Sequence, residues 1–272
     1  MFQIGRDCNI HPTARINVKH GFIGDRALVR EHAVIEGTHV EIGAEAFVNR
    51  SASIGGGSCH DPEAMFKSGD FLHMGIFSHL NCARKLIVGH EFGGGIETKV
   101  FTHGAYTSAW EGFPVQWADV TIGDNVWLPN AWVNPGLSIG SNVVVASRSL
   151  VNKSLPAGCL AGGNPAVVLK ENRYPRALTG AEKRTLFAVI FAQAPAVAGA
   201  AGGGAHAFDA VDDDSYRVDR DTTFHVTARR IEGRATKFTE TLRNQLRRNG
   251  VRFRHLPEKN DYAPWKGVLT SA

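Results

Sequence analysis

Residues 121–151 read TIGDNVWLPNAWVNPGLSIGSNVVVASRSLV, a run in which one aliphatic residue returns about every six positions. The spacings are 6, 5, 6, 6 and 6, and the residues that keep them are Ile122, Leu128, Val133, Ile139, Val145 and Val151. An α-helix repeats its apolar face every 3.6 residues and a half-buried strand every second residue, so neither element explains this rhythm. The run therefore predicts short strands joined by tight turns, each with one aliphatic side chain pointing inward.

The same rhythm governs most of the chain before this run. It starts with spacings of 6, 7, 6, 6, 7, 6 and 6 through Ile10, Ile16, Ile23, Val29, Ile35, Ile42, Val48 and Ile54. It returns at Val88 and Val100, twelve positions apart. Stacked short strands bury a continuous aliphatic column, in which each residue contributes roughly 1.5–3 kcal/mol. We expect a mainly β solenoid; a β-sandwich is disfavoured because its strands do not hold a six-residue register for so long.

Two segments interrupt the rhythm and are predicted as loop insertions, at residues 60–75 and 104–119. The second is rich in aromatic residues, namely Tyr106, Trp110, Phe113 and Trp117. A regular solenoid gains nothing from aromatic excursions, and functional residues are often carried on long loops. The alternative is a loop that covers an otherwise exposed edge of the solenoid.

The rhythm disappears after Lys170, so residues 1–170 and 171–272 are predicted to form different domains. The second should hold a helix from Thr179 to about Ala194 that Pro195 ends, followed by a glycine-rich linker at 199–204. Further on we expect strands at 222–227, 229–234 and 251–256 around a helix at 237–248. This is a small α+β module.

Five arginines gather near the end of that module: Arg243, Arg247, Arg248, Arg252 and Arg254. They indicate either a solvated helix face or a surface for an anionic partner, and the sequence leaves both open.

Composition excludes several classes of protein. Hydrophobic residues make up 43% and charged residues 21%, the balance of a globular chain. The net charge of +4 is too small to indicate nucleic-acid binding. The four cysteines lie far apart, without the close pairs of a zinc ribbon or a disulfide scaffold. No signal peptide and no apolar segment long enough for a membrane span is recognised, so we expect a soluble, cytoplasmic protein.

Four short motifs carry a resemblance to a known family. They are Val100–Gly104, Ile122–Trp127, Asn134–Gly136 and Gly163–Ala166. Over residues 1–170 the chain resembles the hexapeptide-repeat acyltransferases, in particular the galactoside, maltose and xenobiotic acetyltransferases and the surface-polysaccharide O-acetyltransferases. It departs from their usual pattern at Pro129 and Arg148.

The resemblance implies a left-handed parallel β-helix that assembles as a homotrimer. It also implies that acetyl-CoA, the co-substrate, meets the acceptor in clefts between subunits. No metal is implied.

His103 is the candidate general base, because it occupies the family's histidine position just before the aromatic loop. Histidine titrates near neutral pH and can take the proton of an alcohol as it attacks a thioester. His79, His90 and His73 are weaker candidates. Glu97, Glu111 and Asp119 are possible partners that would orient the His103 ring.

The resemblance also implies the residues that contact the two substrates. An oxyanion donor is expected near Asn130, and the cofactor-binding residues are Trp127, Asn130, Ala146, Ser147, Asn152, Lys153, Pro165 and Lys170. The acceptor should meet the flat rings of Tyr106, Trp110 and Trp117 and a polar contact from Asn81.

The function that follows is an acetyl-CoA-dependent O-acetyltransferase acting on a sugar hydroxyl of a cell-surface polysaccharide or its precursor. N-acylation of an amino-nucleotide sugar is the alternative enzyme reading. A non-catalytic β-helix scaffold, or a carbonic-anhydrase-like metal trimer built on histidines, is the alternative from another class.

Overall fold

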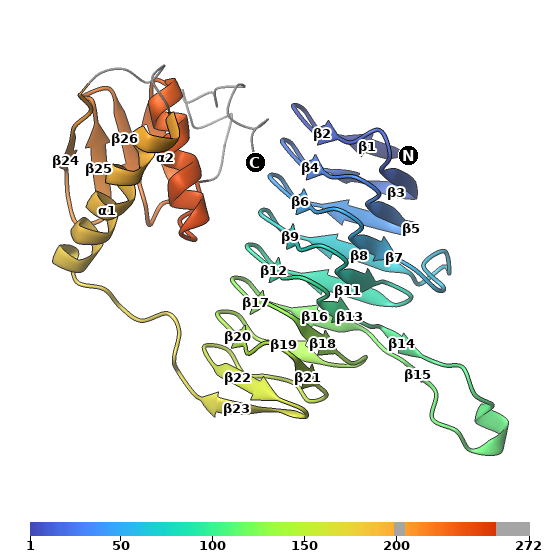
Figure 1. Ribbon diagram of the computed structural model, residues 1–272. Coiled ribbons are helices and arrows are strands. Elements are labelled where there is room, and N and C mark those ends of the chain that lie inside the picture. Colours follow the sequence, from blue (N-terminus) through green and yellow to red (C-terminus); the bar gives the residue numbers. More distant parts are fainter. Residues whose placement is uncertain (199–204, 254–272) are drawn as a thin grey trace. The chain divides into compact units, whose positions relative to one another are not determined.

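A computed structural model describes residues 1–198 and 205–253 of the chain (Figure 1). The chain divides into two compact units, Met1–Arg176 and Ala177–Ala272. The N-terminal unit is a parallel β-helix, and the C-terminal unit contains two α-helices together with a small antiparallel sheet.

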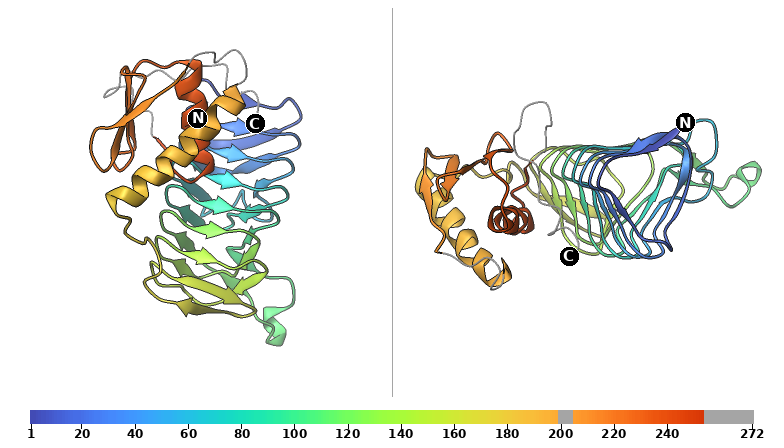
Figure 2. Two further views of the ribbon diagram at one scale, coloured as in Figure 1. Left: turned by 60° about the vertical axis from the view of Figure 1, so that its left-hand side comes forward. Right: turned by 90° about the horizontal axis from the view of Figure 1, so that it is seen from above.

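The β-helix has three faces, and its coils overlay into a roughly triangular outline when viewed from above (Figure 2). The first face consists of β2 (Asn9–Ile10), β4 (Leu28–Val29), β6 (Phe47–Val48), β9 (His73–Met74), β12 (Gly93–Gly94), β17 (Trp127–Leu128), β20 (Val144–Val145) and β22 (Leu160–Gly163). The second consists of β7 (Ser53–Gly55), β10 (His79–Asn81), β13 (Lys99–Val100), β18 (Ala131–Val133) and β21 (Ser149–Val151). The third consists of β1 (Phe2–Ile4), β8 (Met65–Ser68), β11 (Lys85–Val88), β16 (Val120–Ile122) and β19 (Ser138–Ile139).

Three further strands belong to the β-helix itself. The long strands β3 (Arg15–Ile23) and β5 (Val34–Ile42) run through a corner and pair on both the second and third faces. In β5 the bend falls at Gly37, whose φ of 150° is easily adopted only by glycine. At the other end β23 (Ala166–Lys170) turns back and pairs antiparallel with β22, which ends the parallel stack.

The periodic aliphatic residues form the core of the β-helix. Val100 pairs with Val133, and Val133 with Val151 one coil later, so residues in the same register stack on one another. From Ile23 onward every residue of the predicted rhythm is buried, while Ile10 and Ile16 in the first coils are partly exposed. The predicted fold class, a parallel β-helix followed by a small α+β unit, is confirmed.

The insertion predicted at 60–75 is wrong over its second half. Strands β8 and β9 lie there and pair with neighbouring coils. Phe66, Leu72 and Met74 are fully buried and occupy inward positions. An aromatic ring and a thioether fill these positions in place of branched aliphatics, so the rhythm is hidden although the coil continues. The real excursion is limited to the turns between β7 and β8.

The segment predicted as a loop at 104–119 is a hairpin, which we call the arm (residues 103–117). Strand β14 (His103–Gly104) pairs antiparallel with β15 (Gln116–Trp117), and the 3₁₀ helix η1 (Ala109–Glu111) lies between them. The arm projects from one corner of the β-helix (Figures 1 and 2). Tyr106 and Trp110 are completely exposed along it.

The C-terminal unit packs two helices, α1 (Gly180–Ala198) and α2 (Lys237–Arg248), against each other and against a sheet. The sheet is an antiparallel meander of β24 (Phe208–Ala210), β25 (Ser215–Val218), β26 (Thr222–His225) and β27 (Arg230–Gly233). Its core is aromatic: the rings of Phe187 and Tyr216 stack with their centroids 4.0 Å apart. Strands β24 and β25 were not predicted from the sequence.

Two predictions about this unit are corrected. Helix α1 continues through Pro195 to Ala198 instead of stopping. The proline removes one backbone donor, but Ile190 and Ala194 on the preceding turns are buried in the core and hold the helix. No strand begins at Val251, because residues 251–253 are irregular. The rest of that predicted strand, Arg254 and the predicted linker at 199–204 lie outside the described residues.

Some of the arginines predicted to form a surface make hydrogen bonds within the C-terminal unit itself. Arg243 is only 7% exposed, and its Nε lies 3.1 Å from the carboxylate of the buried Glu240. Arg247 donates to the side-chain oxygen of Asn244. These bonds favour a structural role for at least part of the arginine group.

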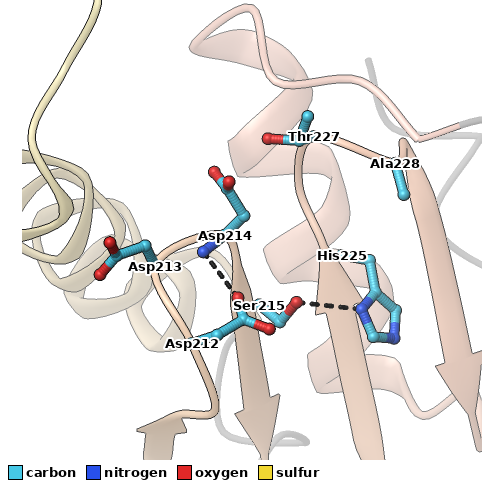
Figure 3. A pocket seen from close by; sticks show the side chains of 7 residues that line it. All are labelled: Asp212, Asp213, Asp214, Ser215, His225, Thr227 and Ala228. Carbon is cyan, nitrogen blue, oxygen red and sulfur yellow. Dashed lines mark hydrogen bonds between the residues drawn. The ribbon is translucent and has the colours of Figure 1, made fainter.

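A hollow in the C-terminal unit is lined by three consecutive aspartates, Asp212–Asp214, and by Ser215, His225, Thr227 and Ala228 (Figure 3). Lys183 of α1 donates to the carboxylate of Asp214 over 2.7 Å, and this bond lowers the pKa of Asp214. Carboxylates near the first turn of a helix stabilise it through the helix dipole. The acidic turn is therefore explained by its contact with α1.

None of the helices in the described residues is both long enough and apolar enough to cross a membrane.

Candidate active site

His103 begins the arm, at the corner that follows strand β13. Its Nδ1 lies 2.9 Å from Oδ1 of Asn81, a side chain of strand β10 that is 1% exposed. The neighbouring Thr102 is fully buried, and its hydroxyl donates to the same oxygen over 2.8 Å. One buried amide oxygen therefore anchors the start of the arm.

The hydrogen bonds of Asn81 determine which nitrogen of His103 carries the proton. The amide nitrogen of Asn81 donates to the carbonyl oxygens of Gly55 and Gly57. Carbonyl oxygens only accept, so the amide cannot be turned around, and its oxygen must face His103. Nδ1 of His103 is then the donor, and in the neutral ring Nε2 keeps the lone pair of a base.

The acidic residues expected to orient His103 do not fill that role among the hydrogen bonds of the described residues. Asp119 accepts instead from the backbone N–H of Lys85, and Glu111 lies in η1 of the arm. Glu97 occupies a corner with a φ of 56°. Asn81 was singled out in the sequence as an acceptor contact, but its polar atoms are engaged by His103, Thr102 and the glycine carbonyls. The sequence contains no signal that joins positions 81 and 103.

The arm also fixes the plane of the His103 ring. His103 and Trp117 are paired in the hairpin, and their rings stack with centroids 4.7 Å apart at 16°. The guanidinium of Arg84 lies 4.7 Å from the centre of the Trp117 ring and bonds to Glu63 over 3.0 Å. Trp117 is predicted to contact the acceptor, but one face of its ring is covered by His103.

A turn of two glycines borders the free edge of His103. A Cβ atom added to Gly57 would lie 3.6 Å from Nε2 of His103. Gly56 has a φ of 87°, which side chains rarely tolerate, so the turn also requires glycine at that position. Because no side chain grows from this turn, space remains beside the nitrogen that carries the lone pair.

The other candidate histidines lie apart from this arrangement, with the exception of His79. His73 is on the first face and stacks on Phe47, and His90 accepts from the backbone N–H of Asp70. His79 bonds to Ser53 on the second face. Across residues 1–198 and 205–253, no three His, Cys, Asp or Glu side chains are grouped so that they could hold a metal ion.

Five of the eight predicted cofactor residues lie on the first face or at the turns beside it. Trp127 is 42% exposed, and its ring crosses the preceding coil at Gly93, where an added Cβ would clash at 2.4 Å. Asn130 and Ala146 lie at the corner after this face, linked through backbone bonds to Arg148 and Ala161. Ser147 is exposed at the same corner, and the exposed Pro165 lies between β22 and β23.

Two of the remaining three predicted cofactor residues lie at a different corner. Asn152 and Lys153 follow Val151, which stacks in register below Val133 and Val100, so they occupy the corner of His103 two coils away. Both are exposed, as is Lys170 at the end of β23.

Within one chain these two groups are separated by strand β18. Asn130 precedes β18 and Asn134 follows it, so roughly 13 Å of extended chain separates the corner of Asn130 from the corner of His103. An oxyanion donor at Asn130 and a base at His103 therefore do not converge within a single chain.

Comparisons with known proteins extend the resemblance. No family model matches the chain. It is 42% identical over 69 residues to the putative colanic acid biosynthesis acetyltransferase WcaF of Escherichia coli (strain K12), over 25% of this chain and 38% of that protein. It is also 42% identical over 53 residues to the galactoside O-acetyltransferase of the same strain, over 19% of this chain and 26% of that protein. The matched part thus spans less than half the length of these relatives.

One solved structure is a hexapeptide-repeat-containing acetyltransferase of Vibrio cholerae O1 biovar eltor, complexed with acetyl coenzyme A. Its alignment covers 63% of this chain and 71% of that one, with 20% identity and a TM-score of 0.38. The sequence matches to the two Escherichia coli acetyltransferases confirm the predicted resemblance to this group of acetyltransferases.

Proposed function

We propose that this protein is an acetyl-CoA-dependent O-acetyltransferase that acts on a sugar hydroxyl of a cell-surface polysaccharide or its precursor. The observation that carries the proposal is the bond from Nδ1 of His103 to the buried oxygen of Asn81. It leaves the lone pair on Nε2, beside a glycine turn that leaves room for an acceptor. A neutral imidazole in this state is a general base.

In the reaction, Nε2 of His103 takes the proton of the acceptor hydroxyl as its oxygen attacks the carbonyl carbon of the thioester. A carbon–oxygen bond forms, the carbon–sulfur bond breaks, and the departing thiolate recovers the proton from His103. The oxygen of Asn81 stabilises the imidazolium in between, because it already accepts from Nδ1. We therefore propose Asn81 as a positioning residue of His103 instead of a contact of the acceptor.

The acetyl-CoA contacts are proposed at the interface of two copies of the chain. The base and the expected oxyanion donor near Asn130 occupy different corners of one chain. A symmetric homotrimer would bring the His103 corner of one copy against Trp127, Asn130, Ala146 and Ser147 of the next. Pro165 and the exposed Asn152, Lys153 and Lys170 remain proposed contacts for the adenosine and its phosphates, with the two ammonium groups as point charges.

The arm is proposed as one wall of the acceptor site. Tyr106 and Trp110 expose their rings completely, and flat aromatic faces suit the apolar faces of a sugar. Trp117 is assigned mainly to holding His103, with which it stacks. The names of two relatives, a colanic acid biosynthesis acetyltransferase and a galactoside O-acetyltransferase, support a sugar hydroxyl as the acceptor.

The experiment that tests the function is a screen of thiol release from acetyl-CoA. The purified protein is offered free sugars, amino sugars, nucleotide sugars and short glycans, and the product is located by mass spectrometry. We expect release with hydroxyl acceptors and an O-acetyl product. An N-acetyl product on an amino-nucleotide sugar would replace the proposal with N-acylation, and no release with any acceptor would favour a scaffold.

Replacing Asn81 tests how His103 is oriented. Asn81→Asp loses the two bonds to the carbonyls of Gly55 and Gly57, but it places a carboxylate against Nδ1, which stabilises the imidazolium, so the base stays protonated to higher pH. We expect the acid limb of kcat/KM to move up by about 1 pH unit or more. Asn142→Ala removes another asparagine bond, the one to Asn125 at an exposed corner, and should leave the profile unchanged. A lower rate with an unmoved profile would mean that Asn81 only supports the fold.

A further inference from the structure

A second imidazole, His79, lies beside the same glycine turn as His103. His79 begins strand β10, two positions before Asn81. A Cβ atom added to Gly56 would lie 2.8 Å from Cε1 and 3.1 Å from Nε2 of His79. A Cβ added to the next residue, Gly57, would lie 3.6 Å from Nε2 of His103. The two rings therefore present the same edge, Cε1–Nε2, to consecutive glycines.

Both rings are held through the opposite nitrogen. Nδ1 of His79 lies 2.8 Å from the hydroxyl of Ser53, as Nδ1 of His103 is held by Asn81. In the described parts of the chain neither Nε2 has a hydrogen-bond partner. The ring of Phe101, with its centroid 6.0 Å away, covers one side of His79. The side chain is thus fixed in place with one polar atom left to bind something else.

Nε2 of His79 differs from Nε2 of His103 because it can donate a hydrogen bond in the neutral ring. The amide oxygen of Asn81 only accepts, but the hydroxyl of Ser53 can donate or accept. When Ser53 donates to Nδ1, Nε2 of His79 carries a proton and becomes a donor. One ring is therefore fixed as a base, while its neighbour is free to donate a hydrogen bond.

The charge state of His79 agrees with this role. Burial, followed by the charges of Lys99 and His103, lowers the pKa of His79, whereas Glu36 acts in the opposite direction. A neutral His79 donates to an uncharged oxygen without opposing the positive charge that His103 gains during the reaction.

We propose that His79 is a specificity-determining residue that binds a second hydroxyl of the acceptor through Nε2, while His103 deprotonates the first. The inference rests on the proposed function and narrows its substrate class. The acceptor is a sugar ring with two hydroxyls close enough to reach both imidazoles, instead of a simple alcohol or an isolated amine. Gly56 and Gly57 keep the floor between the imidazoles free of side chains.

The test combines substitutions of His79 with deletions of single hydroxyls from the sugar. The probes are methyl glycosides of galactose, glucose and mannose and the monodeoxy derivatives of the best acceptor. His79→Gln places an amide nitrogen near the position of Nε2, whereas His79→Asn places it near Nδ1. His79→Ala removes both, and His73→Ala removes an imidazole from the first face as a matched control.

We expect His79→Ala and His79→Asn to raise the acceptor KM about 3- to 10-fold, the value of one hydrogen bond, with the KM for acetyl-CoA unchanged. His79→Gln should recover most of the loss. For the wild type, the KM of one monodeoxy sugar should exceed that of the parent sugar by the same factor. For His79→Ala, that monodeoxy sugar should be no poorer an acceptor than the parent sugar. The His73→Ala control should match the wild type.

Two results would overturn the proposal, and together they distinguish its failure from that of the proposed function. If the wild type acetylates the sugars but His79→Ala discriminates against every deoxy derivative as strongly as the wild type does, His79 is not the group that reads the hydroxyl, and the activity stands. Acceptor binding is also measured directly by saturation-transfer NMR. If no sugar binds the wild type, the inference falls together with the sugar acceptor itself.

Discussion

His103→Ala lowers the turnover of acetyl-CoA with an acceptor by about 100-fold or more, the scale on which general-base catalysis contributes. We attribute the loss mainly to the missing base, because the other hydrogen bonds of Asn81 persist. The buried oxygen of Asn81 still accepts from the hydroxyl of Thr102, and its amide nitrogen still donates to Gly55 and Gly57. Binding of acetyl-CoA and the oligomeric state should therefore stay as in the wild type, measured by calorimetry and light scattering.

His90→Ala is the matched control for this substitution. His90 is a partly exposed corner histidine that accepts from the backbone N–H of Asp70 and belongs to no part of the proposed site. Its replacement should leave kcat unchanged. Near-normal turnover in His103→Ala, with bound acetyl-CoA, would remove His103 from the mechanism and with it the main support for the proposed function.

Mixing two impaired variants restores part of the activity if the site lies between subunits. Trp127→Ala should lower kcat/KM for acetyl-CoA about 10-fold or more, because burying one face of a large aromatic residue contributes about 1.5–3 kcal/mol. It should affect the acceptor less. The His103→Ala chain keeps Trp127, and the Trp127→Ala chain keeps His103. Where the His103 corner of a Trp127→Ala chain meets the Trp127 face of a His103→Ala chain, the junction between the two copies therefore contains both intact residues.

If three copies form a closed ring, as we propose, its symmetry fixes the expected recovery. Chains with different affinity tags are coexpressed, and trimers that hold both are purified through the two tags in turn. Any ring of three that contains both chains has one junction with the intact residues, so activity should return to about a third of the wild-type value. Assemblies of one variant alone, expressed with both tags and purified in the same way, control for any effect of the tags. If the mixed trimers are no more active than either parent, each site lies within one chain.

The β-helix could be predicted from the sequence because its core imposes a local rule. Each short strand must turn one apolar side chain inward, so residues such as Ile122, Val133 and Val151 recur at a fixed spacing, whatever lies further along the chain. The rule failed where Phe66 and Met74 took inward positions, because the packing tolerates any apolar side chain of suitable volume. The predicted helix end at Pro195 is wrong for a related reason, because burial of the preceding turns outweighs a local stop signal.

The candidate site was only half visible in the sequence. His103 could be named from its motif and its place before the aromatic segment. Its bond to Asn81 joins residues twenty-two positions apart on different coils, and no local pattern reports that distance. The same holds for the second imidazole at Gly56, since the contact depends on where two turns of the solenoid meet.

The amino-acid sequence alone determined the repeating coil, because burial of one aliphatic residue per short strand is a condition that each segment meets by itself. It also singled out His103. Only the tertiary structure decided which nitrogen of that ring carries the proton, and which side chains hold its plane. Hydrogen bonds and ring stacking act over about 3 to 5 Å in space, and the stacking of coils, rather than the order of residues, brings such partners together.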